Sequence, residues 1–564
     1  MKKFLNKGLA AFLALSLAAC GNSGSTATTT PETAEATAEA TAEAAAPAAA
    51  ATQDTAAALQ DYNVRRALQL GVDRSAIVTA LDAGSVYYEL FGYVPKGFGG
   101  VNGDFREEVD DAGAYVYTDK EEAKKLLAEA GYGPDNPLKL EYVYNSTAVH
   151  DLVAEVLKAQ WAEIGVELTV RSAEWQTFLD ERDKQGKFEL ARGAMSADYM
   201  DVSTFLDMAK TTNQQGAVTW GDEKYDEMMN QSLLMDGTER LELLHDAEKY
   251  LVEETAQVIP LFAYNTIYLR KPGVTGEKGS PQANHLFWYV ENPGSTTFTY
   301  AIGEPGLLDP AVGTDSTTAY VSNQLGYPLF YIGEDGSMVN AACTDYTVSE
   351  DGMTYTFTLE KNTWSDGQPC TAEDYVYGIK RSLGMGEADS YYSYFISDFV
   401  LNAKDHRGDD IANMDDVGVK ALDDQTLEIT LGQPCPYFVN LLATGVFYAL
   451  RPDFAPEHDS EWSGTGKTFP TNCAFVPTKI DLNDEVVMEK NPNFVHADQV
   501  KVDTLIAKDI DDQDAQFLAF QTGEIDFATS LSPDVLKTFP EGSPELIINP
   551  SVINYYVLIN QHLK

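Results

Sequence analysis

Strand-like and helix-like segments alternate in the early part of this chain, and this alternation constrains the fold class more than any other feature. Residues 119–130 have the apolar spacing of an amphipathic helix, which ends at Gly131. A strand at 138–144, a helix at 149–164 and a strand at 166–170 are predicted next. This β-α-β order predicts an α/β lobe.

Similar patterns continue along the rest of the chain. Residues 61–83 predict a helical region broken at 71–74, where Asp73 can cap a second helix. A turn-rich stretch at 291–295 separates this region from one in which short strands dominate. The other predicted elements are helices at 239–254, 372–383 and 511–522, strands at 258–270, 296–302 and 552–560, and a hairpin of 346–348 with 355–359.

Size and charge narrow the class of protein. With 564 residues and 44% hydrophobic content, the chain is too long for one hydrophobic core, so two to four packed lobes are expected. The formal charge of -48 repels phosphate groups. Binding to nucleic acid or to an anionic lipid surface through a basic patch is therefore not expected.

The N-terminus has the pattern of a secretory signal. Lys2, Lys3 and Lys7 precede the apolar run 8–17, which is too short to span a bilayer. The LAAC sequence that ends at Cys20 resembles the bacterial lipobox, which implies cleavage before Cys20 and acylation of its thiol. No later segment reaches the roughly eighteen uninterrupted apolar residues of a membrane helix. We expect a lipid-anchored protein outside the cytoplasmic membrane.

Composition predicts a tether after the anchor and free thiols in the folded part. Residues 21–58 consist mostly of Ala, Thr, Glu, Ser and Pro, which predicts a disordered tether. The later cysteines form no CxxC motif and have no histidine at metal-ligand spacing, so no metal or other cofactor is predicted. Because each lies among apolar or turn residues, we expect buried free thiols. These cysteines are Cys343, Cys370, Cys435 and Cys473.

The segment 188–206, FELARGAMSADYMDVSTFL, places a cation and an anion on either side of a small-residue turn. A free peptide carries an ammonium at one end and a carboxylate at the other, and each needs an opposite charge when it is buried. Arg192 can bind a carboxylate with two parallel hydrogen bonds, and Asp198 can accept hydrogen bonds from an ammonium. Without further context, a surface ion pair is the favoured reading of two such residues.

Several longer motifs carry a resemblance to a known family. They are WSDG at 364–367 followed by TAEDY at 371–375, FQTGEID at 520–526, NVRRAL at 63–68, AKKLLAEAGY at 123–132, and WQTFLD at 175–180. Together the matching segments span nearly the whole chain beyond the tether. With them, the chain resembles the extracytoplasmic oligopeptide-binding proteins of ABC importers, which are large three-lobed solute receptors.

The order of these motifs departs from that of the family, so the chain resembles a circularly permuted member. Segments that ordinarily begin the mature protein start here at Thr296, and those that ordinarily end it lie near 288–291. The resemblance implies an α/β, three-lobed periplasmic-binding-protein-like fold, with two main lobes joined by a hinge and a smaller third lobe. The expected parts are the signal at 1–20, the tether at 21–58, a ligand-binding lobe at 59–265, main-lobe segments at 266–335 and 446–552, the smaller lobe at 336–445, and a crossover strand at 553–564.

The resemblance also implies roles for particular residues. Asp198 matches the family's acceptor for the α-ammonium of the peptide. Arg192 and His150 match basic positions that meet the carboxylate of the ligand, directly or through water, although a helix-start histidine facing solvent is also common. Trp175 matches a wall of a side-chain pocket, although a core tryptophan is nearly as common at such a position.

Other matched positions complete the expected site and differ in part from the family. Ala197 and Tyr199 flank Asp198 and are expected to contact the ligand. Met195 stands where a tryptophan can line a pocket, and a methionine wall tolerates varied side chains. Ser196 and Ile553 occupy positions that form a disulfide in some members, so this covalent link is not expected here.

These features predict a monomeric, non-enzymatic receptor that binds oligopeptides between two lobes and delivers them to an ABC-type permease. Alternative ligands on the same fold are a dipeptide, nickel, haem, an opine or a sugar oligomer. A secreted hydrolase is a further alternative, but the chain lacks HExxH, GxSxG and phosphate-loop motifs. A structural or signalling surface protein is a third.

Overall fold

The computed structural model describes residues 53–81, 84–112, 114–211, 219–403, 414–540 and 542–563. The predicted signal peptide, Cys20 and most of the predicted tether lie outside these residues. Within the described ranges, we find no helix that combines the length and the apolar character needed to cross a membrane.

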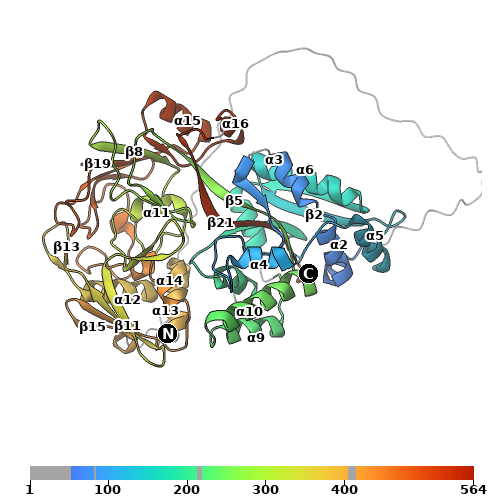
Figure 1. The fold of residues 1–564 in the computed structure, drawn as a ribbon, viewed down its shortest axis with the longest axis horizontal. Helices are drawn as coiled ribbons and strands as arrows, with labels where there is room; N and C mark the ends of the chain where they lie inside the picture. Colours follow the sequence, from blue (N-terminus) through green and yellow to red (C-terminus); the bar gives the residue numbers. More distant parts are fainter. Residues whose placement is uncertain are drawn as a thin grey trace, which may run out of the picture. The chain divides into compact units, whose positions relative to one another are not determined.

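Eleven strands of the described residues form one mixed sheet, ordered β17-β18-β19-β8-β20-β5-β21-β4-β2-β3, with β1 attached to β5. Strands β5 (Val258–Arg270) and β21 (Leu546–Ile559) lie side by side near its centre (Figure 1). We call the part that contains β1 to β4 and helices α1 to α10 the β4 side, and the part that contains β6 to β20 and helices α11 to α16 the β8 side. The β4 side has β1 (Tyr87–Glu89), β2 (Leu138–Asn145), β3 (Val166–Ala173) and β4 (Leu190–Ser196). The β8 side has β8 (Thr297–Ile302), β17 (Phe475–Asp481), β18 (Glu485–Lys490), β19 (Thr504–Asp509) and β20 (Phe527–Ala528).

The pairing of β5 with β21 is interrupted near its middle. Residues 546–549 pair with 266–269, and residues 553–558 pair with 258–264. Between these stretches the backbone N–H of Thr266 donates to the Ser551 hydroxyl (3.1 Å), and the N–H of Ser551 donates to Oδ1 of Asn265 (3.1 Å). Side-chain hydrogen bonds thus replace the regular ladder at this break.

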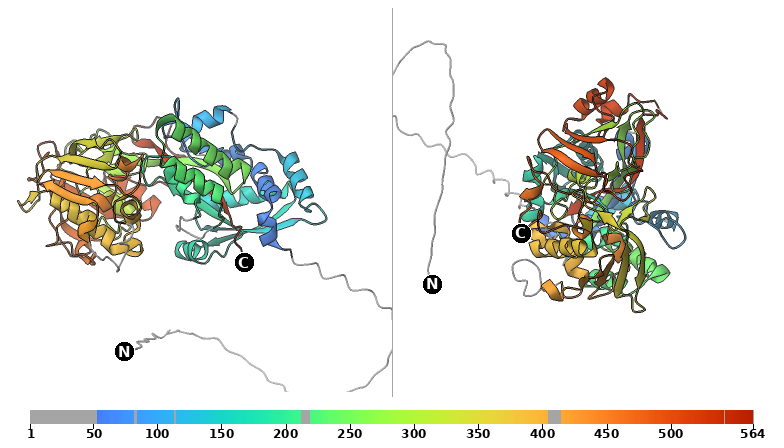
Figure 2. Two further views of the ribbon diagram at one scale, coloured as in Figure 1. Left: turned by 90° about the horizontal axis from the view of Figure 1, so that it is seen from below. Right: turned by 90° about the vertical axis from the view of Figure 1, so that its left-hand side faces the viewer.

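Helices cover both faces of the sheet on the β4 side (Figure 2). Neighbouring strand residues point to opposite faces, so Tyr555 packs into one hydrophobic cluster and Tyr556 into another. The first cluster contains residues of α1, α2, α3, α5 and α6, and the second contains residues of α4, α9 and α10. The helices of the β4 side are α1 (Thr55–Gln60), α2 (Tyr62–Leu70), α3 (Arg74–Leu81), α4 (Phe105–Ala112), α5 (Lys120–Glu129), α6 (Ala148–Ala162), α7 (Trp175–Leu179), α8 (Ser203–Leu206), α9 (Glu223–Ser232) and α10 (Gly237–Lys249).

The helix starts follow from side-chain capping. Asp61 accepts the N–H of Asn63 at 2.8 Å at the start of α2, and Asp119 accepts that of Glu122 at 2.9 Å at the start of α5. Asp73 accepts the N–H of Ala76 at 3.1 Å, which confirms the predicted break before α3. The predicted β-α-β run is confirmed as β2, α6 and β3.

The β8 side carries a second sheet of four antiparallel strands, ordered β11-β12-β16-β15. The predicted hairpin is confirmed as β11 (Cys343–Val348) and β12 (Thr354–Leu359). β16 (Thr426–Thr430) pairs with β12, and β15 (Val419–Asp423) pairs with β16. The helices of the β8 side are α11 (Ser316–Ser322), α12 (Ala372–Asp389), α13 (Tyr394–Phe399), α14 (Phe438–Leu441), α15 (Gln513–Thr522) and α16 (Pro533–Leu536). The four cysteines of this side are free thiols, as predicted; Cys343, Cys435 and Cys473 are buried, whereas Cys370 is only partly buried.

The folded part begins a few residues before the predicted end of the tether. Helix α1 starts at Thr55, where Asp54 accepts the N–H of Ala57 at 3.0 Å. Ala58 and Leu59 are buried in the same cluster as Tyr555. Alanine-rich composition predicted disorder here, but a capped turn that buries two apolar side chains is stabilised by packing.

The described end of the chain lies beside this first helix. Nε2 of Gln60 donates to the backbone carbonyl of Gln561 at 3.2 Å. The two residues are 501 positions apart in sequence. Residues that follow β21 are therefore neighbours of residues that precede α2.

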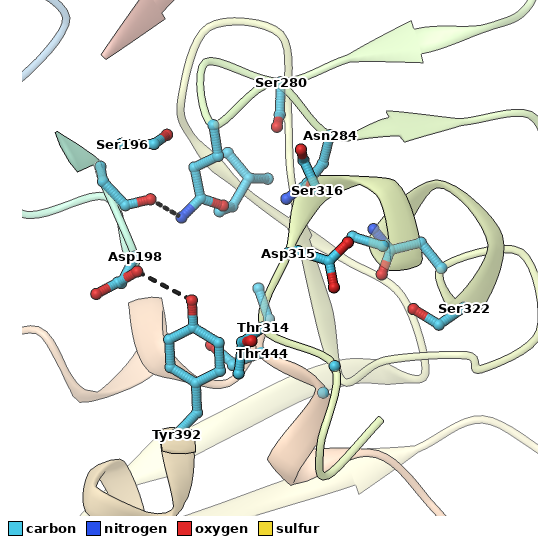
Figure 3. Close-up of a pocket in the computed structure, with 18 of the residues that line it drawn as sticks. Ser196, Asp198, Ser280, Asn284, Thr314, Asp315, Ser316, Ser322, Tyr392 and Thr444 are labelled. Atoms are coloured by element: carbon cyan, nitrogen blue, oxygen red, sulfur yellow. Dashed lines mark hydrogen bonds between the residues drawn. The ribbon is translucent and has the colours of Figure 1, made fainter. Parts of the chain in front are cut away.

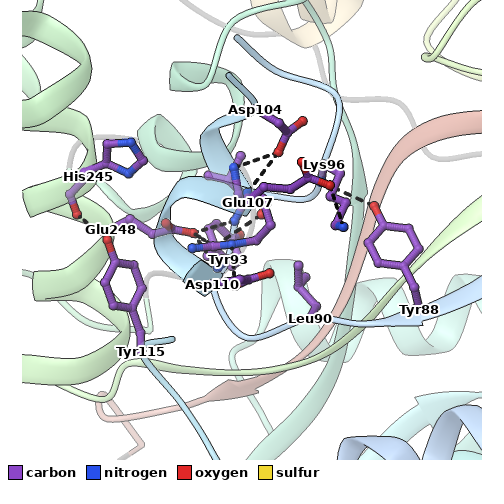
Figure 4. A network of polar contacts seen from close by, with 12 residues as sticks. Tyr88, Leu90, Tyr93, Lys96, Asp104, Glu107, Asp110, Tyr115, His245 and Glu248 are labelled. Carbon is purple, nitrogen blue, oxygen red and sulfur yellow. Dashed lines mark hydrogen bonds and ion pairs between the residues drawn. The ribbon is translucent and has the colours of Figure 1, made fainter. Parts of the chain in front are cut away.

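A buried ionic network joins α4 to α10 on the β4 side (Figure 4). Arg106 and Glu248 are both fully buried, and their Nη1 and Oε1 atoms are 2.6 Å apart. The same oxygen accepts the N–H groups of Tyr93 (2.7 Å) and Val94 (2.8 Å). Asp110 lies 3.2 Å from Nε of Arg106, and burial raises the pKa of its carboxyl group. This network fixes the loop before α4 against α10.

Candidate functional site

A cavity of about 690 Å³ lies between residues of the β4 side and residues of the β8 side. The β4 side contributes α7, the end of β4 and the residues that follow it. The β8 side contributes the hairpin β6–β7, the start of α11 and the segment before α13. Its volume is in the range of small-molecule and peptide side-chain pockets.

Asp198 lies in this cavity, two residues after the end of β4. Its backbone N–H donates to Oγ1 of Thr204 at 2.9 Å, which fixes the turn that presents the carboxylate. Oδ1 accepts a hydrogen bond from the Tyr392 hydroxyl at 3.0 Å, and Figure 3 shows the two side chains facing each other. Among the described residues, no lysine or arginine nitrogen lies within 4.0 Å of this carboxylate.

Asp198 is half-buried, and the protein atoms around it desolvate its carboxylate. This desolvation raises the pKa of Asp198 to about 6, and the hydrogen bond from Tyr392 offsets part of the effect. Near pH 7 the group therefore carries a negative charge that has a neutral hydroxyl as its hydrogen-bond partner. A cation entering the cavity would be attracted to this position.

The hairpin of β6 (Lys278–Gly279) and β7 (His285–Leu286) forms a polar wall of the cavity. Lys278 and Leu286, which pair across the hairpin, face the cavity together with three residues of the connecting turn. The residues that do so are Lys278, Ser280, Gln282, Asn284 and Leu286. Nε2 of Gln282 donates to the carbonyl of Ala197 at 2.8 Å, so the hairpin also contacts the end of β4.

Two buried hydroxyl groups of the cavity wall have no protein partner among the described residues. They are Oγ of Ser280, on the hairpin, and Oγ of Ser196, on β4 (Figure 3). A buried hydroxyl group without a partner costs free energy, so unpartnered hydroxyls are expected to bind water or a ligand. Both add hydrogen-bonding capacity to the cavity.

Four of the seven ligand-binding residues expected from the sequence line this cavity. Asp198, Ala197 and Met195 lie at the end of β4, and Trp175 lies at the start of α7. The indole of Trp175 remains 48% exposed and stacks near Phe178, with ring centroids 6.0 Å apart. Trp175 is therefore a wall residue and not a core residue.

Tyr199 does not line the cavity. It is buried and stacks on Tyr437, with ring centroids 4.9 Å apart. Its ring also packs edge-on against Phe395 of α13. This tyrosine holds the turn after β4 against the β8 side.

Arg192 and His150 form a separate cluster around Tyr555 of β21. The guanidinium of Arg192 lies over the Tyr555 ring at 5.3 Å, and Nδ1 of His150 lies 3.4 Å from the Tyr555 hydroxyl. Burial and the nearby guanidinium lower the pKa of His150 to about 3, so this histidine is neutral at pH 7. Neither side chain lines the cavity that contains Asp198.

A close approach of β4 to β21 explains the glycine in the middle of this segment. A Cβ atom on Gly193 would lie 2.3 Å from the ring of Tyr556. Glycine is therefore required where the two strands meet. Strand register places Arg192 beside Val557 of β21, and the cavity residues follow at the end of β4.

The sequence prediction missed Tyr392 and the whole β6–β7 hairpin. Each of these strands has two residues, which is too short for a recognisable apolar pattern. Polar residues alternate with small residues from Lys278 to Asn284, and this pattern could have indicated the hairpin. Tyr392 lies in a run of tyrosines, SYYSY at 390–394, that gives no indication of which ring faces Asp198.

A family model described as bacterial extracellular solute-binding proteins, family 5, middle part, matches residues 22–217 and 337–563, which make up most of the chain. The chain belongs to this family. The relatives in this family are solute-binding receptors and not enzymes. They are extracytoplasmic proteins.

Individual relatives match a smaller part of this family 5 protein. It is 33% identical over 230 residues to the periplasmic oligopeptide-binding protein OppA of Escherichia coli, covering 40% of this chain and 41% of that protein. It is 30% identical over 228 residues to the dipeptide-binding protein DppE of Bacillus subtilis, covering 40% and 41%. It is 34% identical over 261 residues to the probable deoxycholate-binding protein YgiS of E. coli, covering 46% and 48%. The chain thus spans less than half the length of these relatives.

Solved structures include similar proteins. The murein tripeptide binding protein of E. coli is 27% identical, with a TM-score of 0.41, covering 44% of this chain and 48% of that chain. OppA of Listeria monocytogenes bound to peptide is 25% identical, with a TM-score of 0.38, covering 41% and 46%.

Proposed function

We propose that this family 5 protein is a lipid-anchored receptor that binds oligopeptides in the described cavity and delivers them to an ABC-type permease. The observation that carries this proposal is Asp198, a desolvated carboxylate in the cavity with a neutral hydroxyl as its partner. Membership of the family and the names of the relatives support a solute receptor. The anchor at Cys20 rests on the sequence.

The α-ammonium of a peptide fits the acceptors around Asp198. An ammonium has three donors, and Asp198 offers two oxygens beside the hydroxyl oxygen of Tyr392. Displacing the Tyr392 hydroxyl from Oδ1 exchanges a neutral hydrogen bond for a charge-assisted one. The neighbouring carbonyl of Ala197 extends this set of acceptors.

We assign the carboxylate end of the ligand to Arg192. No carboxylate of the described residues lies within 4.0 Å of its guanidinium, which leaves the cation available for a ligand. His150 is neutral at pH 7 and would act as a hydrogen-bond donor or acceptor, directly or through water. Because Arg192 lies outside the present cavity lining, a ligand would reach it from the Tyr555 side.

Side chains of the ligand would occupy the space between Trp175, Met195 and the β6–β7 hairpin. The exposed indole and the methionine thioether adapt to varied apolar groups. The unpartnered hydroxyls of Ser196 and Ser280 can hold water between the ligand and the wall. This combination favours broad sequence tolerance with tight binding of the peptide backbone and ends.

Calorimetric titration with one peptide in three forms tests this function. A free tetra-alanine should bind, N-acetylation should weaken binding by about 100-fold, and C-terminal amidation by about tenfold. Native mass spectrometry of the purified protein checks which ligand is retained. Retention of a bile acid, metal, haem, opine or sugar, with no heat from any peptide, would overturn the proposal in favour of another solute.

We also propose that the chain is a circularly permuted three-lobed receptor. The neighbouring positions of Gln60 and Gln561 support this order, because the usual sequence would run from one to the other. The two family-model matches, which leave out residues 218–336, are consistent with a join near 291–295. In this proposal residues 59–265 form the ligand-binding lobe and β21 crosses between lobes.

Reconnecting the chain tests the permutation. A variant that starts at Ser295, runs to Gln561, continues through a glycine-serine linker into Asp54 and ends at Asn292 should fold and bind the same peptides within about threefold. This variant keeps helix α1, and linkers of about six and about nine residues span the helix and the Gln60 side chain that separate the two ends. Circular dichroism and calorimetry provide the readout. An insoluble or non-binding product from both linker lengths would contradict the permuted order.

A further inference from the structure

Lys278 places a positive charge on the hairpin wall of the cavity. Its Nζ donates to the hydroxyl of Tyr331 at 2.9 Å. The ammonium also lies over the rings of Tyr331 (5.1 Å) and Tyr289 (5.8 Å). These contacts orient the ammonium, and a tyrosine hydroxyl uses one of its three donors.

The charge of Lys278 is not neutralised by the protein part that the structure describes. No carboxylate of these residues lies within 4.0 Å of its Nζ. Its sequence neighbour Glu277 directly precedes the strand, accepts from Tyr268 at 3.1 Å and pairs with Arg270. Glu277 is therefore compensated by Arg270 and does not neutralise Lys278.

The other charged groups of the cavity wall have a charged partner, a structural role at a helix start, or an assigned role in the proposed function. Nη2 of Arg182 is 2.8 Å from Oδ2 of Asp183. Asp315 accepts two hydrogen bonds of 2.8 Å from Thr318 at the start of α11. Asp198 is the acid that the proposed function assigns to the ligand ammonium. Lys278 is then the remaining charge of the wall without an assigned partner.

A second polar group lies on the same edge of the hairpin. Ser280 is two residues further along, is 5% exposed, and its hydroxyl has no protein partner among the described residues. Both residues line the cavity, and an ammonium and a hydroxyl two residues apart can donate to the two oxygens of one carboxylate. The pair therefore offers a two-point anion site inside the cavity.

We propose that Lys278, with Ser280, binds a carboxylate of the ligand, so that the cavity prefers peptides with an acidic group at this place. This inference rests on the proposed peptide-binding function and refines its substrate class. A neutral ligand that fills the cavity removes water from the ammonium without replacing its charge, which costs free energy. An acidic ligand supplies a charge-assisted hydrogen bond instead. The carboxylate can belong to an aspartate or glutamate side chain or, in a ligand too short to reach Arg192, to the C-terminus.

Paired peptides distinguish these two sources. Tetra-alanine variants with Glu at position 2, 3 or 4 are compared by calorimetry with their Gln counterparts, and each is also made as a C-terminal amide. For wild type, Glu at one position should bind about tenfold more tightly than Gln if a side chain is bound. If the C-terminus is bound, amidation should weaken binding about tenfold with no Glu preference.

Substitutions at Lys278 decide the assignment. Lys278→Met should reduce the Glu-to-Gln ratio, or the acid-to-amide ratio, to about one, and Lys278→Arg should retain most of it. Lys125→Met removes the same charge from the exposed surface of α5 and should leave the ratio unchanged. Wild-type ratios near one in every arm, or ratios that persist in Lys278→Met, would overturn the inference. Absence of binding by every peptide to wild type would instead overturn the peptide-receptor function, and this inference with it.

Discussion

Replacing Asp198 by asparagine is expected to weaken binding of a free-amine oligopeptide by about 100-fold or more. The substitution keeps the shape of the side chain and removes the charge that a buried ammonium needs. Breaking one partner of a buried ion pair costs about 3 kcal/mol or more, which corresponds to at least about 100-fold in Kd. Isothermal titration calorimetry at pH 7.5 measures this change.

The pH dependence of binding provides a readout specific to this carboxylate. Because desolvation raises the pKa of Asp198 to about 6, the free protein takes up a proton there as the pH falls through 6. A peptide ammonium requires the ionised form, so the proton must leave on binding. Wild-type affinity should therefore fall by about tenfold per pH unit below about 6. The asparagine variant should show no such dependence.

Two controls separate a lost ion pair from a general defect. Asp534→Asn removes a carboxylate that is 96% exposed on the β8 side and should bind peptide like wild type. An N-acetylated peptide should bind equally weakly to wild type and to Asp198→Asn. If the variant and wild type bound the free-amine peptide with equal Kd at pH 7.5, the ammonium site would have to lie elsewhere.

Replacing Glu248 by glutamine is expected to lower the free energy of unfolding by about 3 kcal/mol or more. Glu248 carries the charge that compensates the fully buried Arg106. The side chain of Asp110 is 27% exposed and lies on the other side of the guanidinium, so it compensates only part of the charge. Urea unfolding followed by circular dichroism measures the change.

A double substitution tests whether the loss comes from the unpaired cation. Arg106→Met combined with Glu248→Gln removes both charges and should be more stable than Glu248→Gln alone. Glu242→Gln, on the exposed face of the same helix α10, is the matched control and should change stability by less than about 0.5 kcal/mol. A similar loss in the control and in Glu248→Gln would contradict a role for the buried charge pair.

Long, strongly patterned elements could be predicted from the sequence. The strand predicted at 258–270 has the bounds of β5, and the helix and strands around α6 lie within a few residues of their predicted positions. Their apolar spacing extends over enough residues to distinguish a helix from a strand. The start of α1 was missed because alanine-rich composition does not reveal that Ala58 and Leu59 are covered by the rest of the fold.

The candidate site was predictable only in part. Asp198 could be proposed because the resemblance to the peptide-binding family assigns it to the ligand ammonium, and it lies in the cavity. Arg192 is near in sequence, but the register of β4 with β21 places it in the Tyr555 cluster. Tyr392 and Lys278 come from segments far from Asp198 in sequence, and only tertiary folding brings them to one cavity.

The interrupted ladder between β5 and β21 determines where the backbone can rotate. Apart from a one-residue register shift at Tyr555/Tyr556, the rest of the pairing is regular and fixes the torsion angles of both strands, so a rotation there would break several main-chain bonds together. At Asn265, Thr266 and Ser551 the bonds run through a side-chain amide and a hydroxyl, which can turn about their own single bonds and stay joined. A pivot of this kind would let the cavity open and shut while the strands on either side remain intact.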